Sequence, residues 1–487
     1  MALDPESMTS LVWIRGRLAG GILWMTLLSI GSPGEGRAQG PEPVPPAPEV
    51  VAAPDTIPSA PGAVVAPDTI PPAAVGDLGT NGGVATGHVS VYPANHRYPQ
   101  DDTGMPFVLI GFGNETKNTV DVLSQFAGRI NYTRCYAAGW DSRADPNEYG
   151  MGRPYPTVNG LTDMDQWNEA YWSNLRDFLT NAQQLGLNVG LTLFDGHYDL
   201  PGGKIGTYST WNSARNVQGV QWAFNATALS QYPNPSPSGG SAERLVYYQR
   251  RWVDRLLHEI APFSNVILEL DNETSGVSSS WFLWWADHFL TSGAYVIATT
   301  GDANGSIADN VFSSDSRLHM KSYHLRDDAV ITSTRYSWNK IIVADADNSC
   351  TTPDGTTSRR LAWRSMLRGG HWNDFTCGGV PLPSLAKLDY YKYLLDFIRN
   401  ADVRPWEMAP HTELVTSGMA MAKPGSDYLV YTEANVTVNL TAASGTLLWQ
   451  WYNPRDGTLA SSGTIAGGAS RSFTLPGSGD WVLWITK

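Results

Sequence analysis

Apolar and polar positions along the chain predict alternating strands and helices between about residues 106 and 411. The clearest unit is centred on residues 266–274, where an apolar, β-branched run ends in the polar cluster Asp271-Asn272-Glu273-Thr274. A short continuous apolar run is typical of a strand buried on both faces, as in a parallel sheet or barrel. Residues 244–260, just before it, carry apolar side chains at helical spacing. A helix, a buried strand and then carboxylates is the order of a β/α barrel, whose active sites lie at the carboxyl ends of the strands.

Seven further segments have the character of buried strands. They are residues 106–113, 129–136, 187–194, 294–299, 318–324, 340–344 and 370–375. Helical periodicity fits between most of them, for example at residues 172–185, 281–290 and 359–367. Eight parallel strands that alternate with helices predict an α/β fold, a (β/α)8 TIM barrel spanning residues 85–411.

From about residue 412 the pattern changes to short strands separated by Gly, Pro and Asp turns. The strands are residues 428–431, 436–440, 447–452, 472–475 and 481–485. This pattern predicts a small antiparallel β-sandwich over residues 412–487. Trp449 and Trp451 share a face by the two-residue period, and we expect that face to pack within the sandwich or on the barrel.

The N-terminus has the features of an export signal. Arg15 and Arg17 precede an apolar run at residues 18–30, and Gly36-Arg37-Ala38 offers a small-x-small cleavage site. The pattern predicts a signal peptide at residues 1–38. The run is too short for a typical membrane span, so we expect no stable membrane insertion after cleavage, with a retained N-terminal anchor as the alternative.

Residues 39–84 form a Pro- and Ala-rich segment. It contains a near repeat, residues 51–58 and 64–71, and it has too few large apolar side chains to build a core. We predict a disordered linker, which either holds the folded part away from a membrane or wall or is neutral filler. Signal and linker together predict a protein that is secreted or held at the cell surface, in the extracellular space or periplasm of a bacterium. We expect it to be a monomer.

Composition narrows the classes of partner. The formal net charge of −13 argues against nucleic acid, because phosphate binding needs a basic surface. The 19 Trp and 21 Tyr residues are mostly expected in the core, but such an excess also suits stacking on sugar rings. No Cys-x-x-Cys or His-Glu-x-x-His pattern predicts a metal site. Cys350 and Cys377 could pair in an oxidising compartment.

The pair Asn272-Glu273 after a hydrophobic strand resembles the signature of the clan A retaining glycoside hydrolases, which are cellulase-like barrels. The resemblance implies that Glu273 is the acid/base on the fourth barrel strand and that Asn272 binds the sugar. The run from Trp451 to Gly457, with residues 479–483, resembles the C-terminal β domain often labelled collagen-binding in bacterial glycoside hydrolases. In those enzymes that domain packs on a barrel.

In clan A the nucleophile comes from the end of strand seven, where this chain reads Val343-Ala344-Asp345-Ala346-Asp347-Asn348. Aspartates therefore stand where most of the clan has a Glu. Asp345 ranks first because the strand run ends there, and Asp347 shares its facing. A pair of loop-capping aspartates is the structural alternative. A register with Ala346 at the Glu position would mean lost or altered catalysis.

The resemblance also implies that other strand ends bind the substrate. Arg134 ends strand two, where the clan often has an Arg that orients the nucleophile, although a structural salt bridge would also explain it. The remaining candidates are His197 after strand three, Trp211 on the following loop, Tyr323 and His324 on strand six, and Trp372 on strand eight. Glu269 is interpreted as part of an interior network, and Asp271 as a carboxylate that supports the Asn-Glu pair.

These observations favour a secreted glycoside hydrolase that cleaves a β-linked polysaccharide or oligosaccharide. It would use a retaining double displacement with two carboxylates and no cofactor. The rival hypothesis is a non-catalytic polysaccharide-binding or cell-surface protein on a barrel that has lost its nucleophile. Whether a strand-seven carboxylate lies within reach of Glu273 separates the two.

Overall fold

The computed structural model describes residues 89–114, 120–137, 152–196, 210–274, 277–293, 296–301, 307–324, 327–346, 355–376 and 383–487. The chain divides into two compact units, residues 1–74 and residues 75–487, and all the described residues belong to the second. The predicted signal peptide and the whole predicted linker, residues 39–84, lie outside the described residues. No described helix is long and apolar enough to cross a membrane.

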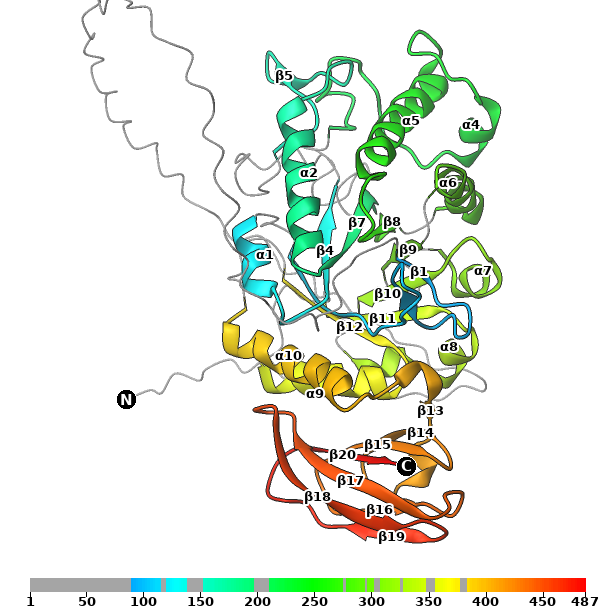
Figure 1. Cartoon of the computed structure of the whole chain (residues 1–487). Coiled ribbons are helices and arrows are strands. Elements are labelled where there is room, and N and C mark those ends of the chain that lie inside the picture. Colours follow the sequence, from blue (N-terminus) through cyan, green and yellow to red (C-terminus); the bar gives the residue numbers. More distant parts are fainter. Residues whose placement is uncertain are drawn as a thin grey trace, which may run out of the picture. The chain divides into compact units, whose positions relative to one another are not determined.

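Eight parallel strands close into a barrel, which confirms the predicted fold (Figure 1). Around the barrel the strands follow the order β10-β11-β12-β3-β4-β7-β8-β9. Their bounds are β3 (Ile110–Asn114), β4 (Tyr132–Tyr136), β7 (Asn188–Asp195), β8 (Val266–Asn272), β9 (Ile297–Thr300), β10 (Met320–His324), β11 (Ile341–Asp345) and β12 (His371–Thr376). Every strand end that the sequence selected for chemistry therefore lies on the same rim of the barrel.

Helices follow the strands and cover the outside of the barrel, with α2, α5, α6 and α10 visible around it in Figure 1. The helices are α1 (Val120–Phe126), α2 (Glu169–Gln184), α4 (Ala226–Gln231), α5 (Ser241–Ile260), α6 (Ser279–Thr291), α7 (Asp309–Ser314), α8 (Ser333–Ser337), α9 (Gly355–Leu367) and α10 (Leu385–Asn400). Shorter elements are β1 (Ser90–Val91), β2 (Pro99–Gln100), β5 (Thr157–Val158), β6 (Leu161–Thr162) and the 3-10 turns Asp328–Val330, Pro405–Glu407 and Thr412–Leu414.

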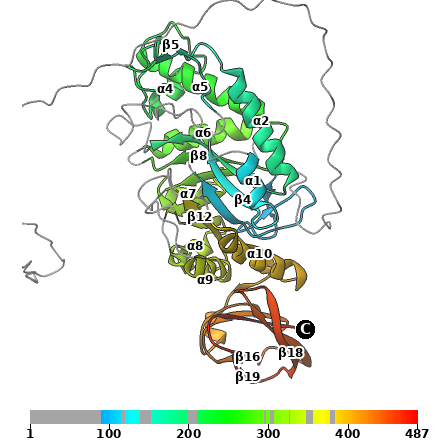
Figure 2. The same ribbon diagram turned by 90° about the vertical axis from the view of Figure 1, so that its left-hand side faces the viewer.

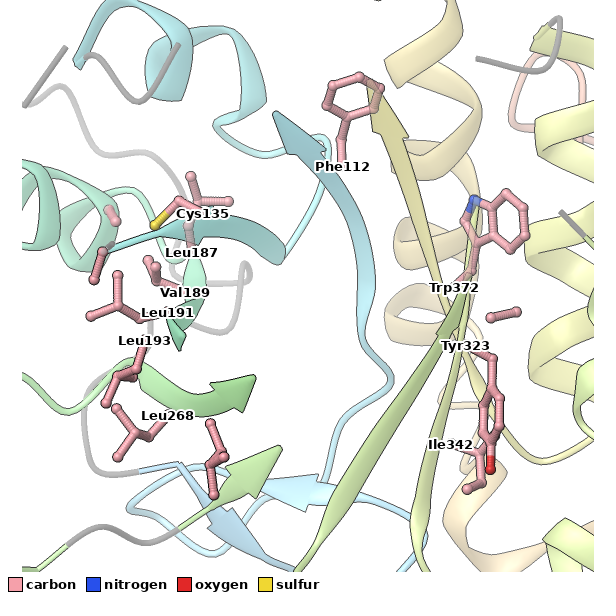
Figure 3. Packing of buried hydrophobic residues seen from close by; sticks show 14 of the residues in the cluster. Phe112, Cys135, Leu187, Val189, Leu191, Leu193, Leu268, Tyr323, Ile342 and Trp372 are labelled. Carbon is pink, nitrogen blue, oxygen red and sulfur yellow. The ribbon is translucent and has the colours of Figure 1, made fainter. Parts of the chain in front are cut away.

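Alternation along the strands divides the barrel side chains between two cores. Inward residues at the amino-terminal end form an apolar plug: Val89, Leu109, Tyr132, Ile267, Val296, Ala298, Met320, Ile341 and Val343. Outward residues such as Leu191, Leu268 and Ile342 join the larger core under the helices (Figure 3). Glycine is needed beside the plug, because a Cβ on Gly190 would lie 2.3 Å from the Tyr132 hydroxyl. The polar side chains at the rim therefore lie above a closely packed apolar core inside the barrel.

The C-terminal residues form the predicted antiparallel β domain. Six strands pair in the order β13-β14-β15-β20-β17-β18. The remaining two, β16 and β19, pair with each other and are labelled next to each other in Figure 2. Their bounds are β13 (Ala409–Pro410), β14 (Met419–Lys423), β15 (Asp427–Thr432), β16 (Val436–Asn439), β17 (Thr446–Asn453), β18 (Thr458–Ala466), β19 (Ser470–Phe473) and β20 (Trp481–Thr486). Trp451 is buried inside this domain, as its facing predicted.

The β domain shares a buried interface with the barrel. Arg359 of α9 donates to both carboxylate oxygens of Asp480, at 2.9 and 2.8 Å, and the Tyr431 hydroxyl donates to the same carboxylate at 2.7 Å. Trp363 of α9 stacks on Tyr431 with an interplanar angle of 11°. Breaking such a buried pair leaves an uncompensated charge, so the domain is expected to be an integral part of the folded unit.

Candidate active site

Polar side chains from six strands meet at the carboxyl-terminal rim of the barrel. They are Arg134 on β4, Asp195 on β7, Glu269 and Asn272 on β8, His324 on β10, Asp345 on β11 and Asn373 on β12, with Glu273 directly after β8. Strand register aligns Asp195 with Asn272, His324 with Asp345, and Asp345 with Asn373. All of them except Glu273 are buried.

Arg134 lies at the centre of this cluster and is itself fully buried. Its Nε donates to both oxygens of Glu269, at 3.0 and 2.9 Å, and its Nη2 donates to Glu269 at 2.5 Å and to Asn272 Oδ1 at 2.7 Å. The Asn272 amide in turn donates to Asp195 Oδ2 at 3.3 Å. A bidentate guanidinium–carboxylate pair fixes direction as well as charge. The interior-network role expected for Glu269 is thereby confirmed.

Glu269 and Asn272 are three residues apart, yet both side chains reach Arg134. A regular strand would put them on opposite faces. The pairing of β8 with β9 changes register between these two residues, and such a bulge re-aims the side chains that follow it. The bulge therefore turns the Asn-Glu pair toward the barrel interior.

Glu273 stands just beyond the strand and has the most open carboxylate of the cluster, with 39% of its side chain exposed. Its backbone is in the left-handed region, with φ of +52°, a conformation that costs a non-glycine residue free energy and that concentrates at functional sites. His324 Nδ1 lies 2.9 Å from Glu273 Oε1. Oε1 of this carboxylate therefore contacts His324 at the edge of the buried cluster.

Asp345 lies deeper, with none of its side chain exposed. Its Oδ1 accepts from the Asn373 amide at 3.2 Å. Its Oδ2 is 3.7 Å from Arg134 Nη1 and 3.9 Å from His324 Nε2, and none of the described residues donates a hydrogen bond to it. Burial raises the pKa of Asp345, and the charges of Arg134 and His324 only partly oppose that rise.

The imidazole of His324 therefore lies between the two carboxylates, with Nδ1 toward Glu273 and Nε2 toward Asp345. Its Nε2 also lies 3.5 Å from Arg134 Nη1, which can only donate. Asp345, at the end of β11, is the candidate nucleophile that the sequence analysis ranks first. The His324 ring lies between it and Glu273. Because one imidazole lies beside both carboxyl groups, a change of charge at one of them affects the other.

Two aromatic rings border the cluster. The Arg134 guanidinium lies 5.1 Å from the Tyr136 ring centroid and 5.5 Å from that of Phe375, and the two rings meet edge to face. Both residues lie near the ends of their strands, β4 and β12. Both rings are buried, and they pack against the Arg134 guanidinium as the apolar border of the cluster.

Three predicted binding residues are not part of this cluster. Tyr323 and Trp372 are buried in the core on the outer side of the strands, as Figure 3 shows. The Tyr323 hydroxyl donates to Asp309 at 2.7 Å, and the Trp372 indole donates to the Tyr391 hydroxyl at 3.4 Å. Trp211 packs against Trp222, with ring centroids 5.0 Å apart. The physical reason for the first two is alternation, because neighbours of inward His324 and Asn373 must point outward.

Four of the residues singled out in the sequence, His197, Asp347, Cys350 and Cys377, lie outside the described residues. Sequence reasoning left Asn373 and Phe375 out of the site. The two residues share a face of β12, because inward positions recur every second residue, but the sequence alone does not show which face of that strand points inward. Within the described part of the chain, no group of three His, Cys, Asp or Glu side chains is arranged to hold a metal ion.

The fold is similar to solved glycoside hydrolase structures. One titled "Glycoside hydrolase" has 14% identity and a TM-score of 0.57, covering 83% of this chain and 98% of that one. A glycoside hydrolase family 5 protein from Bacteroides vulgatus has 14% identity and a TM-score of 0.55, covering 82% and 93%. A second Bacteroides vulgatus structure, titled a putative glycoside hydrolase, has 12% identity and a TM-score of 0.56, covering 82% of each chain.

Residues 414–486 match the family described as "Putative collagen-binding domain of a collagenase". No curated protein sequence matches the chain. At these identities the likeness to solved structures establishes the fold, a barrel of the glycoside hydrolase kind followed by a β domain. What the site does has to be argued from its own geometry.

Proposed function

We propose that this protein is a glycoside hydrolase that cleaves a β-linked polysaccharide or oligosaccharide with retention of configuration. The observation that carries the proposal is the Glu273–His324–Asp345 arrangement at the barrel rim. Glu273 after β8 is partly exposed and Asp345 at the end of β11 is buried. A double displacement needs two such carboxyl groups. The bidentate pair of Glu269 and Arg134 fixes the guanidinium, which lies between the ends of β8 and β11.

In the first step Glu273 gives its proton to the glycosidic oxygen while an Asp345 oxygen attacks the anomeric carbon. The C–O bond to the leaving alcohol breaks, and a glycosyl ester forms on Asp345. In the second step Glu273 takes a proton from water, and the water oxygen displaces Asp345 from the same carbon. The sugar leaves with its original anomeric configuration, and both carboxyl groups return to their starting states.

The protonation states set the pH dependence of this sequence. Asp345 must be ionised to attack, and burial raises its pKa above the usual value of 3.8. The rate should therefore fall as the pH drops through that raised pKa, so the acid side of the pH–rate profile lies higher than for an exposed aspartate. Arg134 and His324 favour the ionised form and limit the shift.

One observation favours the rival hypothesis of a non-catalytic polysaccharide-binding protein. Asp345 is wholly buried, and an aspartate is one methylene shorter than the glutamate that the resemblance calls for at this strand end. A carboxylate that substrate does not reach would leave a barrel that binds sugar at Glu273 and Tyr136 without cutting it. The titles of the similar structures favour hydrolysis.

The deciding experiment is incubation of the full chain with a panel of β-glucan, β-mannan, xylan and β-galactan, with reducing ends measured over time. Proton NMR of the first-formed product should give the anomer of the substrate bond. Initial formation of the opposite anomer would replace retention by inversion. Sugar binding without release of reducing ends, unchanged in Glu273→Gln, would establish the binding-protein alternative.

We also propose that the protein acts outside the cytoplasm, supported by the apolar run at residues 18–30 and the Pro-rich stretch after it. Fractionation of cells that express the full chain tests this. The protein should appear in the medium or periplasm, shortened by about 38 residues if cleavage follows Ala38. Retention of the full-length chain in the cytoplasm would contradict it.

A further inference from the structure

We propose that the hydrogen bond between Asp271 and Thr274 is a positioning device for Glu273, which holds the carboxyl in line for proton transfer. The inference rests on the proposed function, because it assigns these two residues a part in the same reaction. Their hydrogen bond joins the two residues to each other and not to a side chain of the catalytic cluster. Both act through the backbone of the residue they enclose.

The bond closes a four-residue segment around the catalytic pair. Thr274 Oγ1 donates to Asp271 Oδ2 at 2.5 Å, so the side chains on either side of Asn272 and Glu273 are tied together. Both side chains belong to fully buried residues. A hydrogen bond to a carboxyl group out of water is stronger than one at the surface. The segment that carries Glu273 is therefore bracketed at both ends.

The bracketed backbone needs such a restraint, because Glu273 adopts φ of +52°. An isolated glutamate would relax toward negative φ, which would swing its carboxyl away from His324. A backbone strained by about 1 to 3 kcal/mol persists only where the surroundings hold it. Asn272 supplies one hold through Arg134 and Asp195, and the Asp271–Thr274 bond supplies the other.

Gly196, just after β7, closes the remaining side of the segment. A Cβ at this position would lie 2.5 Å from the Glu273 carbonyl oxygen and 2.6 Å from the Thr274 Cα. These are backbone atoms, which cannot turn aside as a long side chain can. The backbone after β7 thus lies directly against residues 273 and 274, and any larger residue at 196 would push the catalytic segment outward.

In the described part of the chain, the Asp271 side chain has one hydrogen bond, the one to Thr274. Among the described residues, no donor bonds to its Oδ1. Lys321 lowers the pKa of Asp271 more than Arg134 does, but its Nζ donates to Ile307 O and to Asp309. Burying a carboxyl group for a single hydrogen bond is costly. Its one bond spans the catalytic glutamate, and this placement points to positioning as its role.

The test compares two substrates of the same sugar, the oligosaccharide that the panel identifies and its 2,4-dinitrophenyl glycoside. Thr274→Val removes the hydroxyl and keeps the shape. We expect kcat on the oligosaccharide to fall about 10- to 100-fold, because that leaving group needs the proton of Glu273. On the dinitrophenyl glycoside, which leaves without protonation, kcat should change less than about threefold.

Matched variants separate positioning from simple destabilisation. Thr274→Ser keeps the donor and should keep the ratio of the two rates. Asp271→Ala should reproduce the Thr274→Val ratio, and the double variant should lose no more than the larger single change, since both remove one bond. Loss of folded protein would instead lower both rates equally, and melting temperatures would record it.

The possible failures differ from one another. An active parent whose Thr274→Val variant keeps its rate ratio overturns the positioning role and leaves the proposed function standing. Equal losses on both substrates, with a lower melting temperature, also overturn it in favour of a structural role. A parent that cleaves no glycan overturns the proposed function, and the positioning role with it.

Discussion

The ends of β8 and β11 deliver the two carboxyl groups in different ways. On β8 the carboxyl follows the strand by one residue, has a left-handed backbone and is 39% exposed. On β11 Asp345 is still part of the strand, pairs in register with His324 and Asn373, and is fully buried. The first strand end is held by tertiary contacts around a strained turn, and the second by the barrel itself.

This difference suits two different tasks. A proton donor must meet a leaving group that changes from one substrate to the next, so an edge position is useful. A nucleophile must meet one carbon with a fixed geometry, so a group fixed in a closed sheet suits it. Arg134 connects the two, because it bonds to Glu269 and Asn272 on β8 and lies 3.7 Å from Asp345 on β11.

The largest effect on activity is expected from removing the carboxyl group of β11. Asp345→Ala should lower kcat by about 10⁴- to 10⁶-fold on both the oligosaccharide and its dinitrophenyl glycoside, because neither can form the glycosyl ester. Initial rates with enzyme at high concentration measure this. Asp347→Ala is the matched control and should stay near the parent. If the two variants exchange behaviour, Asp347 is the attacking group.

Removing the proton donor of β8 should have a smaller and more selective effect. Glu273→Gln keeps the size of the side chain and a bond partner for His324, but it cannot donate a proton to the leaving oxygen. We expect kcat on the oligosaccharide to fall about 10²- to 10⁴-fold, with a much smaller loss on the dinitrophenyl glycoside. Equal losses on both substrates would mean that Glu273 is not the acid.

The sequence was sufficient for the β8 end and less so for the rest of the rim. A continuous apolar run followed by Asn272-Glu273 marks both a buried strand and its polar end, because a barrel strand has no solvent-facing side. The same property conceals which side chains point into the barrel and which point toward the helices. Both alternate sets of residues 318–324 and 370–375 mix polar and apolar side chains, so neither segment reveals which set points inward. Tyr323 and Trp372, expected at the substrate, lie on the outer side.

Facing is decided by the closure of the barrel and by local irregularities. The bulge between Glu269 and Asn272 comes from the pairing of β8 with β9, a contact between strands that one strand's own residues do not encode. On β12 the inward position opposite Asp345 belongs to Asn373 because the two strands pair in that register. Such pairings depend on the whole ring of eight strands.

The link between the two strand ends can be tested through stability. Arg134→Met leaves Glu269 buried without its partner, and we expect the free energy of unfolding to fall by about 3 to 5 kcal/mol. Urea unfolding of both proteins measures the difference. Arg129→Met is the control, because its pair with Asp389 is about one-third exposed and should contribute less than about 1 kcal/mol. Equal losses in the free energy of unfolding would mean that the buried Arg134 pair stabilises the fold no more than the partly exposed Arg129 pair.

The smallest predicted effect concerns the second carboxyl group of the β8 end, Asp271. Burial raises its pKa from 3.8 to about 8, with a further rise from Glu269 and opposing effects of the Thr274 hydrogen bond, Lys321 and Arg134. Between pH 4 and pH 8 the folded chain then keeps a proton that the unfolded chain has lost, so this group makes stability fall as the pH rises. Asp271→Asn cannot ionise, so its stability should lose this component of the pH dependence.

The comparison is made by urea unfolding of the parent and Asp271→Asn at pH 5 and pH 8. While the pH lies between the unfolded pKa and the folded pKa of about 8, each pH unit costs the parent about 1.4 kcal/mol of stability. We therefore expect the parent to lose at least about that much more stability than the variant between the two pH values. Parallel changes in both proteins would mean that Asp271 ionises freely in the folded state. The β8 end would then hold an ordinary carboxylate beside Glu273, and its contrast with the buried carboxyl of β11 would be sharper.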